Sequence, residues 1–133
     1  EKKFVVLGGG SCHCPWCGWR PQCPVLYLEF FYSPMPGQFR SENRGLIGYD
    51  KREIFEWHEL SNERPDETAD LKPLAKIILH KKQWAMQNLG LKSLLSPSGN
   101  PVALNQYIAL KEGDEILLSR ATKGRLVKVR YLP

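Results

Sequence analysis

Long apolar runs are missing from this chain of 133 residues. No run approaches the roughly 20 residues that a membrane-spanning helix needs, and the apolar stretch at residues 4–7 is too short for a secretory signal peptide. No segment of useful length has the periodicity of an amphipathic helix. We therefore expect a cytoplasmic protein that does not insert into membranes.

The composition also lacks the signature of a disordered chain. Hydrophobic residues make up 42% and charged residues 25% of the sequence, as in ordinary soluble globular domains. The length is sufficient for one domain with a small appendage. Ten prolines and eleven glycines are scattered between short apolar runs, which indicates many turns and short strands.

Signals of catalysis are absent as well. The triple glycine at residues 8–10 is not followed by the Lys-Ser/Thr pair of a phosphate-binding P-loop. His13, His58 and His80 have no serine, cysteine or carboxylate partner at a recognisable spacing. We therefore expect no enzymatic activity.

Cysteine is absent outside one short segment, which contains Cys12, Cys14, Cys17 and Cys23. The sequence from Cys14 to Cys17 and the following glycine resembles half of a zinc knuckle, in which two thiolates lie one tight turn apart. Because zinc prefers four nitrogen or sulfur ligands, we predict one structural zinc ion held by all four thiolates, with His13 as a substitute ligand. The alternatives are a pair of disulfides, free thiols or a redox pair, and an iron–sulfur cluster.

Three residues within the cysteine segment are candidates for contacts with a partner: Trp16, Trp19 and Arg20. Trp and Arg are enriched at the hot spots of protein interfaces, and aromatic and cationic loops also suit nucleic acids. Packing of the cysteine segment against the rest of the chain is the alternative role for these side chains.

The net charge is +5, and the most basic stretch is the C-terminal end, which has no acid after Glu115. The cations of this stretch are Arg120, Lys123, Arg125, Lys128 and Arg130. The last two alternate with apolar residues, as in a half-buried strand. The cations form either the solvated face of a last strand or a patch for nucleic acid or another acidic partner.

Short elements separated by turn residues recur along residues 25–133. We expect them at residues 25–32, 46–49, 53–57, 74–79, 84–89, 102–104, 115–119 and 125–132, with a polar, acid-rich loop at residues 61–70. Spacing of this kind is typical of an all-β sandwich or barrel. The chain therefore divides into a cysteine segment, residues 1–24, and a β domain, residues 25–133.

Three features of the second half are shared with a known family. They are the pair Leu89-Gly90, the turn glycine Gly99 followed by Val102, and a Gly113-Asp114 turn that leads into a strand. In this order and spacing they resemble the second half of a forkhead-associated (FHA) domain. The family is a β-sandwich that reads phosphothreonine in partner proteins. The resemblance covers about residues 26–132 and implies an FHA-like β-sandwich.

The phosphate-reading residues of the FHA family are replaced in this register. Tyr49 stands where an Ile-Gly-Arg motif has its arginine, residues 71–74 (Leu-Lys-Pro-Leu) stand where the family has Ser-Arg-x-His, and Ser93 occupies the position of an asparagine. A phosphate needs arginine and hydroxyl or amide donors, so the phosphothreonine site is predicted to be lost. Lys51, Arg52 or Lys72 could replace the arginine from neighbouring positions.

The sequence thus predicts a non-enzymatic protein–protein interaction module that acts as a scaffold or assembly subunit. One alternative is a nucleic-acid-binding protein that uses the zinc knuckle and the basic terminal strand. A second alternative is a phosphopeptide reader with a rebuilt pocket. The acid-rich loop at residues 61–70 would repel a phosphopeptide and suit a basic partner.

Overall fold

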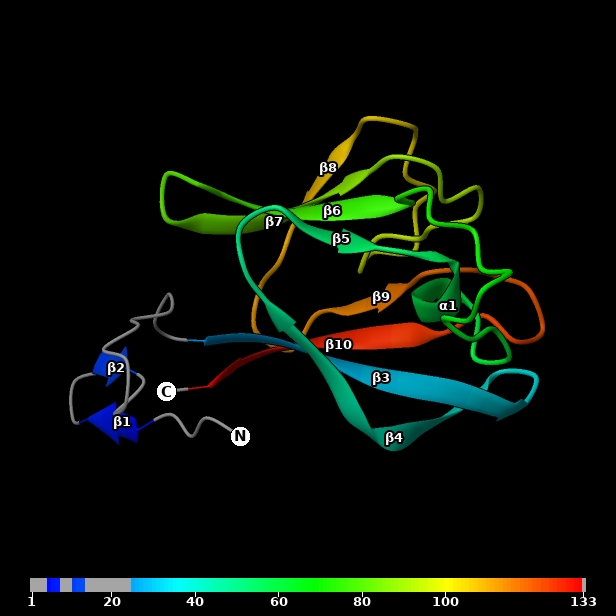
Figure 1. Cartoon of the computed structure of the whole chain (residues 1–133), viewed down its shortest axis with the longest axis horizontal. Coiled ribbons are helices and arrows are strands. Elements are labelled where there is room, and N and C mark those ends of the chain that lie inside the picture. Colours follow the sequence, from blue (N-terminus) through cyan, green and yellow to red (C-terminus); the bar gives the residue numbers. More distant parts are fainter. Residues whose placement is uncertain (1–4, 8–10, 14–24, 133) are drawn as a thin grey trace.

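The computed structural model of the chain describes residues 5–7, 11–13 and 25–132, and Figure 1 shows how its elements are arranged. Over the described residues the strands are β1 Val5–Leu7, β2 Ser11–His13, β3 Val25–Met35, β4 Gln38–Gly48, β5 Arg52–Ile54, β6 Ala75–His80, β7 Gln83–Asn88, β8 Tyr107–Ala109, β9 Glu115–Leu117 and β10 Leu126–Leu132. The helix α1 covers only Glu56–Glu59. In this part of the chain, no helix has the length and apolar character needed to cross a membrane.

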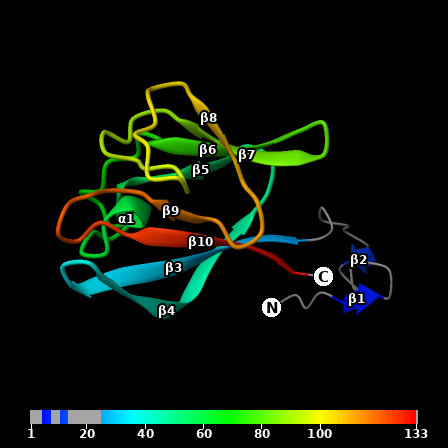
Figure 2. The same ribbon diagram turned by 180° about the vertical axis from the view of Figure 1, so that it is seen from behind.

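Two four-stranded antiparallel sheets make up most of the described chain. Their strand orders are β4-β3-β10-β9 and β5-β6-β7-β8, and Figures 1 and 2 show them as two layers. Side chains from both sheets meet in one core, whose fully buried large members are Leu26, Leu28, Ile54, Ile77, Met86, Leu91, Leu94, Leu110, Ile116, Leu118, Val127 and Val129. The predicted all-β fold is confirmed, whereas the likeness to a forkhead-associated domain stays a prediction.

Alternating apolar residues explain why β3 and β10 form the centre of the first sheet. In β3, Leu26, Leu28 and Phe30 are buried while the residues between them are half-buried, which is the two-residue period of a strand. β10 repeats the pattern with Val127 and Val129. The two strands pair antiparallel along their length, so the first and last strands of residues 25–132 lie side by side.

Two pairs of neighbouring strands form antiparallel hairpins. β6 pairs with β7, and β9 pairs with β10. Gly99 and Gly113, which the sequence assigns to turns, both have a φ of 85°, a left-handed conformation that favours glycine. The acid-rich loop at residues 61–70 contains no strand or helix, as predicted.

β4 is much longer than the sequence indicates. The expected element at residues 46–49 overlaps only its end, because the strand begins at Gln38. Its first half is mostly polar and exposed and lies at the edge of the sheet, so it lacks the apolar alternation on which a strand prediction depends. β3 likewise continues beyond the predicted residues 25–32 to Met35.

Two other expected elements differ from the structure. The element at residues 53–57 divides into the end of β5 and the start of α1, because the Nδ1 atom of His58 accepts a hydrogen bond from the Phe55 N–H at 2.9 Å and so caps a helical turn. Within the described chain, residues 102–104 form no strand, and β8 follows them instead. β8 is a short edge strand without a buried residue, so no apolar pattern marks it.

A wide bulge interrupts β4. Gly45 lies opposite Glu29 and Ser41 lies opposite Phe31, so residues 42–44 together face the single residue between Glu29 and Phe31. Asn43, in the middle of the bulge, has a φ of 57°. Bulges of this kind bend a strand and turn its side chains in new directions.

The connections between strands gather at two ends of the described domain (Figure 1). The loop end comprises the β3–β4 turn, α1 with residues 60–74, residues 89–106 and the turn between β9 and β10. The opposite hairpin end comprises the β6–β7 turn, the connection between β4 and β5, and residues 110–114 between β8 and β9.

Candidate functional site

A groove opens at the loop end between the β3–β4 turn and the turn that joins β9 to β10. This β3–β4 groove has a volume of about 380 Å³ and is lined by residues 33–37, Phe39, Leu117 and residues 119–124. Met35 is 58% exposed and Phe39 is 37% exposed, so the groove presents apolar side chains to solvent. Binding sites are commonly concave and lined by apolar side chains with a few polar groups.

The turn between β9 and β10 forms one lip of the groove and is held by its own hydrogen bonds. The buried Ser119 hydroxyl accepts a bond from the Ala121 N–H at 3.1 Å. Ser93 supports the same turn, because its hydroxyl donates to Ser119 Oγ and accepts from the Arg120 N–H at 3.0 Å. A Cβ at Gly124 would lie 2.0 Å from the carbonyl oxygen of Ser119, so the turn requires glycine there.

The β3–β4 turn forms the other lip. Ser33 Oγ donates to the carbonyl oxygen of Met35 at 2.7 Å, and Pro34 and Pro36 restrict the backbone on either side of Met35. Gly37 has a φ of 78° and closes the turn. Both lips are therefore formed before a ligand arrives, which lowers the entropy lost on binding.

The charge of the groove is positive. Arg120 and Lys123 are exposed, and neither forms an ion pair with a described residue. Among the described residues that line the groove there is no aspartate or glutamate. The groove therefore combines apolar surface with two positive charges.

Other cations of the basic C-terminal stretch have acidic neighbours. Arg130 Nε lies 3.0 Å from Glu29 Oε1, and Lys128 lies opposite Glu29 on one side and Glu115 on the other. The Ser41 hydroxyl, which donates to Glu29 at 2.6 Å, and the nearby Arg130 lower the pKa of the Glu29 carboxyl. The basic terminal strand thus does not form a continuous positive surface.

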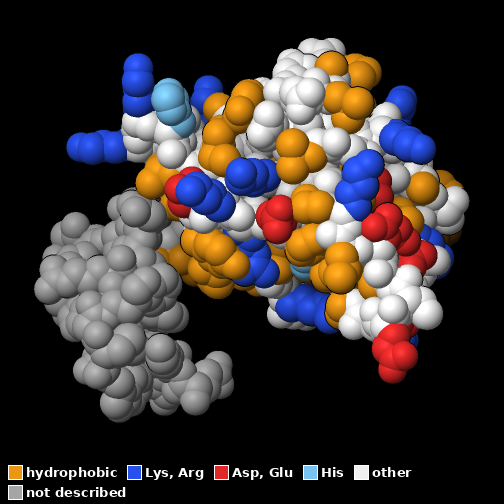
Figure 3. Space-filling model, turned by 45° about the horizontal axis from the view of Figure 1, so that its top comes forward, with side chains coloured by type: hydrophobic (Ala, Val, Ile, Leu, Met, Phe, Trp, Pro, Cys, Tyr) orange, Lys and Arg blue, Asp and Glu red, His pale blue; other side chains and the backbone are white. Residues whose placement is uncertain are grey.

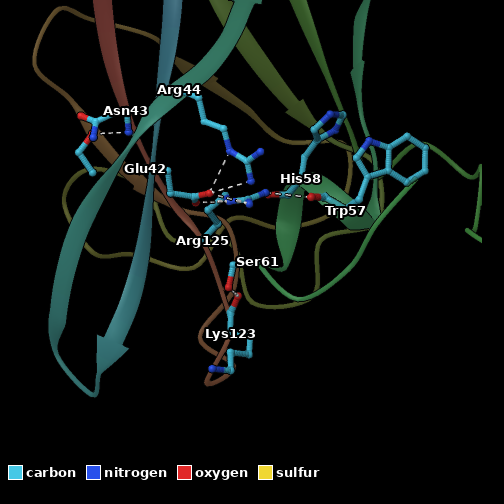
Figure 4. Close-up of polar contacts among 9 residues, drawn as sticks. Glu42, Asn43, Arg44, Trp57, His58, Ser61, Lys123 and Arg125 are labelled. Atoms are coloured by element: carbon cyan, nitrogen blue, oxygen red, sulfur yellow. Dashed lines mark hydrogen bonds and ion pairs between the residues drawn. The ribbon is translucent and has the colours of Figure 1, made fainter. Parts of the chain in front are cut away.

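Arg125 is buried and paired with an acid at the loop end (Figure 4). Its Nε and Nη2 atoms donate to the two carboxylate oxygens of Glu42, at 2.6 and 3.0 Å. Its Nη1 atom donates to the carbonyl oxygen of Trp57 at 2.8 Å, and the guanidinium lies 4.5 Å from the centre of the Phe30 ring. A bidentate pair of this kind is a strong, directional contact, and it joins β4 and α1 to the turn between β9 and β10.

His58 lies beside this ion pair. Its pKa falls from 6.5 to about 4, because burial disfavours the charged ring and because Arg52 and Arg125 bring positive charge nearby. The ring is therefore neutral at pH 7, and since Nδ1 accepts a backbone hydrogen bond, Nε2 carries the proton. The nearby Ser61 donates its hydroxyl to the carbonyl oxygen of Lys123, so this geometry does not form a serine–histidine pair.

The predicted partner-binding residues in the described domain fall at both ends. Tyr49 and Lys51 lie at the hairpin end, where the Lys51 N–H donates to the backbone of β6. Arg52 begins β5, and its guanidinium lies 5.0 Å from the centre of the Tyr49 ring. Lys72 and Ser93 lie at the loop end. The structure therefore does not bring Tyr49 or Lys51 together with Lys72 and Ser93.

The remaining predicted site residues belong to the cysteine segment. Those outside the described residues are Cys14, Cys17, Cys23, Trp16, Trp19 and Arg20. Cys12 lies in β2, of which the structure describes the backbone. The structural zinc ion, its alternatives and the boundary at residue 24 therefore stay predictions.

Sequence reasoning did not find the β3–β4 groove or the Glu42–Arg125 pair. The residues of the pair are 83 positions apart, and no local pattern indicates that they meet. One signal for the groove was present, because Met35 stands between two prolines in a turn, and turns run over the surface of a protein. The β9–β10 turn on the other side of the groove is brought next to Met35 by the pairing of β3 and β10.

Comparison with protein-family models, with curated proteins and with solved structures gives no match. In Figure 3, acidic side chains gather toward the right-hand side of the visible face, whereas lysine and arginine side chains are spread over it. On this face the charged side chains therefore form local groups and not one large surface of a single sign.

Proposed function

We propose that this chain is a non-enzymatic protein-binding module, a scaffold or assembly subunit, that docks a segment of its partner in the β3–β4 groove. The observation that carries the proposal is the exposure of Met35 and Phe39 beside Arg120 and Lys123. Interfaces commonly combine a buried apolar anchor with charged groups around it. The partner segment is expected to contain an apolar side chain flanked by acidic residues, because opposite charges steer association and fix register.

Apolar surface on preformed lips is the main reason to prefer a protein partner over nucleic acid. Nucleic-acid binding depends on many cations that neutralise phosphates, and Arg125 and Arg130 are already paired with Glu42 and Glu29. Methionine adapts its shape to different apolar partners, which suits Met35 to a peptide ligand.

Peptide selection tests the proposed function. Random 12-residue peptides displayed on phage would be selected against the full chain, and enriched peptides would be synthesised and measured by fluorescence anisotropy. We expect sequences with Asp or Glu beside Leu, Met or Phe. The double substitution Met35→Ser and Phe39→Ser is expected to weaken their binding by about tenfold or more, as the loss of two apolar contacts implies.

Matched variants control for nonspecific effects. Tyr107→Ser removes an exposed aromatic side chain from β8 and is expected to leave binding unchanged. Arg120→Gln with Lys123→Gln should weaken binding, whereas Lys81→Gln with Lys82→Gln, at the hairpin end, should not. Equal binding by the groove variants and the wild type would contradict the proposal.

The same assay separates the two alternative functions. Binding confined to phosphothreonine peptides, with no binding of their unphosphorylated counterparts, would identify a phosphopeptide reader. Tight binding of a single-stranded oligonucleotide that falls steeply with salt would identify a nucleic-acid-binding protein. Salt-tolerant binding of unphosphorylated peptides supports the protein-binding module.

A further inference from the structure

A second hollow lies at the loop end, on the other side of the contact between Ser61 and Lys123. Its volume is about 500 Å³, and it opens between residues 44–46 of β4 and residues 57–65. We call it the Arg44 hollow. The Ser61 N–H donates to the carbonyl oxygen of Lys123 at 2.8 Å, and this contact separates the Arg44 hollow from the β3–β4 groove.

One carboxylate serves two arginines at this hollow. Arg125 occupies both oxygens of Glu42, and Arg44 shares Glu42 Oε1, with its Nη2 atom at 3.1 Å (Figure 4). The Arg125 side chain is 3% exposed, whereas that of Arg44 is 68% exposed. The Glu42–Arg125 pair is thus held in place, whereas the exposed side chain of Arg44 can turn toward a ligand.

Arginines outnumber acids among the residues that line the hollow, with Glu42 counted beside them. Three arginines, Arg44, Arg64 and Arg125, face two glutamates, Glu42 and Glu63. The neighbouring His58 is neutral at pH 7. This excess of positive charge suits an anion, and Glu63 repels a dianion such as a phosphate more strongly than a monoanion such as a carboxylate.

Donors and apolar surface accompany this charge. His58 lines the hollow and carries its proton on Nε2, which no described residue accepts. Phe30 and Leu46 are buried at the hollow, and Trp57, whose ring stacks on Phe55 at 4.7 Å, is also among its lining residues. A ligand here would place an acid near a guanidinium and an apolar body against aromatic rings.

We propose that the Arg44 hollow binds an acidic side chain of a partner protein segment, with a neighbouring aromatic side chain packed against Trp57. Arg44 supplies the charged contact, and Glu42 holds Arg125 in place beneath it. This inference rests on the proposed function in one respect, namely that the loop end meets a partner protein. The bulge at residues 42–44 accounts for the site, because it turns Glu42 and Arg44 toward the same place.

Three blocked dipeptides provide the test: acetyl-Phe-Glu-amide, its neutral analogue acetyl-Phe-Gln-amide, and acetyl-Phe-phosphoserine-amide. Each would be titrated into the ¹⁵N-labelled full chain and followed by NMR. We expect the glutamate peptide to shift the Gly45 amide and the Trp57 indole N–H, with a dissociation constant on the order of 1 mM for so small a ligand. The glutamine peptide should bind about tenfold more weakly, because it lacks the charge-assisted bond.

Two arginine variants make the test specific. Arg44→Gln should weaken the glutamate peptide about tenfold, while Arg40→Gln, an exposed arginine on the same strand, should leave its binding unchanged. Equal binding of the glutamate and glutamine peptides, tighter binding of the phosphoserine peptide, or an unaffected Arg44→Gln variant would each overturn the proposal.

The outcome is separable from that of the proposed function. The groove variant Met35→Ser with Phe39→Ser should still bind the glutamate dipeptide, because the β3–β4 groove and the Arg44 hollow are lined by different residues. Dipeptide binding without any selected groove peptide would support the carboxylate site and contradict docking in the groove. Binding in the groove without dipeptide binding would support docking in the groove and contradict the carboxylate site.

Discussion

Asn88 is a polar residue without exposed surface, and its side chain organises the loop that follows β7. Its Nδ2 atom donates to the carbonyl oxygens of Leu91 and Val102, each at 2.9 Å. Its Oδ1 atom accepts from the Gly90 N–H at 3.2 Å and from the Leu91 N–H at 2.8 Å. One amide therefore satisfies four backbone groups at the loop end.

We expect Asn88→Ala to lower the free energy of unfolding by about 2–4 kcal/mol, because it leaves several buried backbone groups without partners. Urea denaturation followed by circular dichroism would measure the change. Asn100→Ala is a suitable control, since Asn100 is exposed, and it should cost less than about 0.5 kcal/mol. Similar losses for the two variants would contradict this role of Asn88.

His58 should make stability depend on pH. Its pKa is about 4 in the folded chain and 6.5 without the fold, so the unfolded chain binds more protons between these values. Stability contributed by neutral His58 is therefore present above pH 6.5 and is lost as the pH falls toward 4. The pKa difference alone corresponds to about 3 kcal/mol of the free energy of unfolding. We expect about 1–2 kcal/mol, because the ring is partly exposed and solvent screens it.

Denaturation of the wild type and His58→Gln at a series of pH values would measure this effect. The pKa of Glu59 is raised by burial and by Glu56, so Glu59 acts in the opposite direction in both proteins and cancels in the difference. The variant should lose less stability than the wild type between pH 6.5 and 4. His80→Gln, which changes an exposed histidine, should behave like the wild type.

At the scale of elements, the β6–β7 turn is strained. Lys81 and Lys82 have φ values of 49° and 65°, as a two-residue turn of type I′ requires. Lysine is unfavourable in this left-handed conformation, by roughly 1–2 kcal/mol per residue, whereas asparagine and glycine adopt it readily.

We expect Lys81→Asn with Lys82→Gly to raise the free energy of unfolding by about 1 kcal/mol and the melting temperature by a few degrees. Thermal unfolding would measure the change. Lys81→Gln with Lys82→Gln removes the same charges without relieving the strain, so it should have little effect. If both double substitutions raised the free energy of unfolding equally, the gain would come from the removal of charge and not from the relief of strain.

Elements with a clear apolar period could be predicted from the sequence, and elements without one could not. β3, β6, β7 and β10 bury alternate residues on a single face, and all four were expected close to their observed positions. The polar half of β4 and the exposed β8 have no such pattern, because both lie at sheet edges. Their positions depend on backbone pairing rather than on side-chain burial.

The candidate site was less predictable than the fold for a related reason. Its parts come from β4, α1 and the β9–β10 turn, which meet only when β3 pairs with β10. The basic C-terminal stretch shows the difficulty. The sequence presents Arg125 as one cation among several, and only the distant Glu42 makes it a buried partner rather than a surface charge.

At the scale of the whole molecule, the cysteine segment provides a separate prediction. If one zinc ion is held by the four cysteines, Cys14→Ser should reduce the bound zinc from about one ion per chain to near zero, because a tetrahedral site loses a ligand. Elemental analysis of purified protein would measure the metal. The ¹⁵N NMR spectrum of residues 25–132 should stay nearly unchanged, because their core contains no cysteine.

A control variant and a thiol count complete this test. Ser11→Ala, which changes the residue before Cys12, should retain its zinc. Zinc content equal to that of the wild type in Cys14→Ser would contradict the predicted ligand set. Absence of reactive thiols in the unfolded, metal-free wild type would identify disulfides instead.

The pairing of β3 with β10 places Val25 opposite Leu132. The chain thus enters and leaves the domain at one point, at the far end from the β3–β4 groove. Domains with adjacent ends tolerate circular permutation and insertion into a loop of another protein. New ends could be opened at the exposed β6–β7 turn, and the domain could be carried as a guest on a host protein with its groove pointing outward.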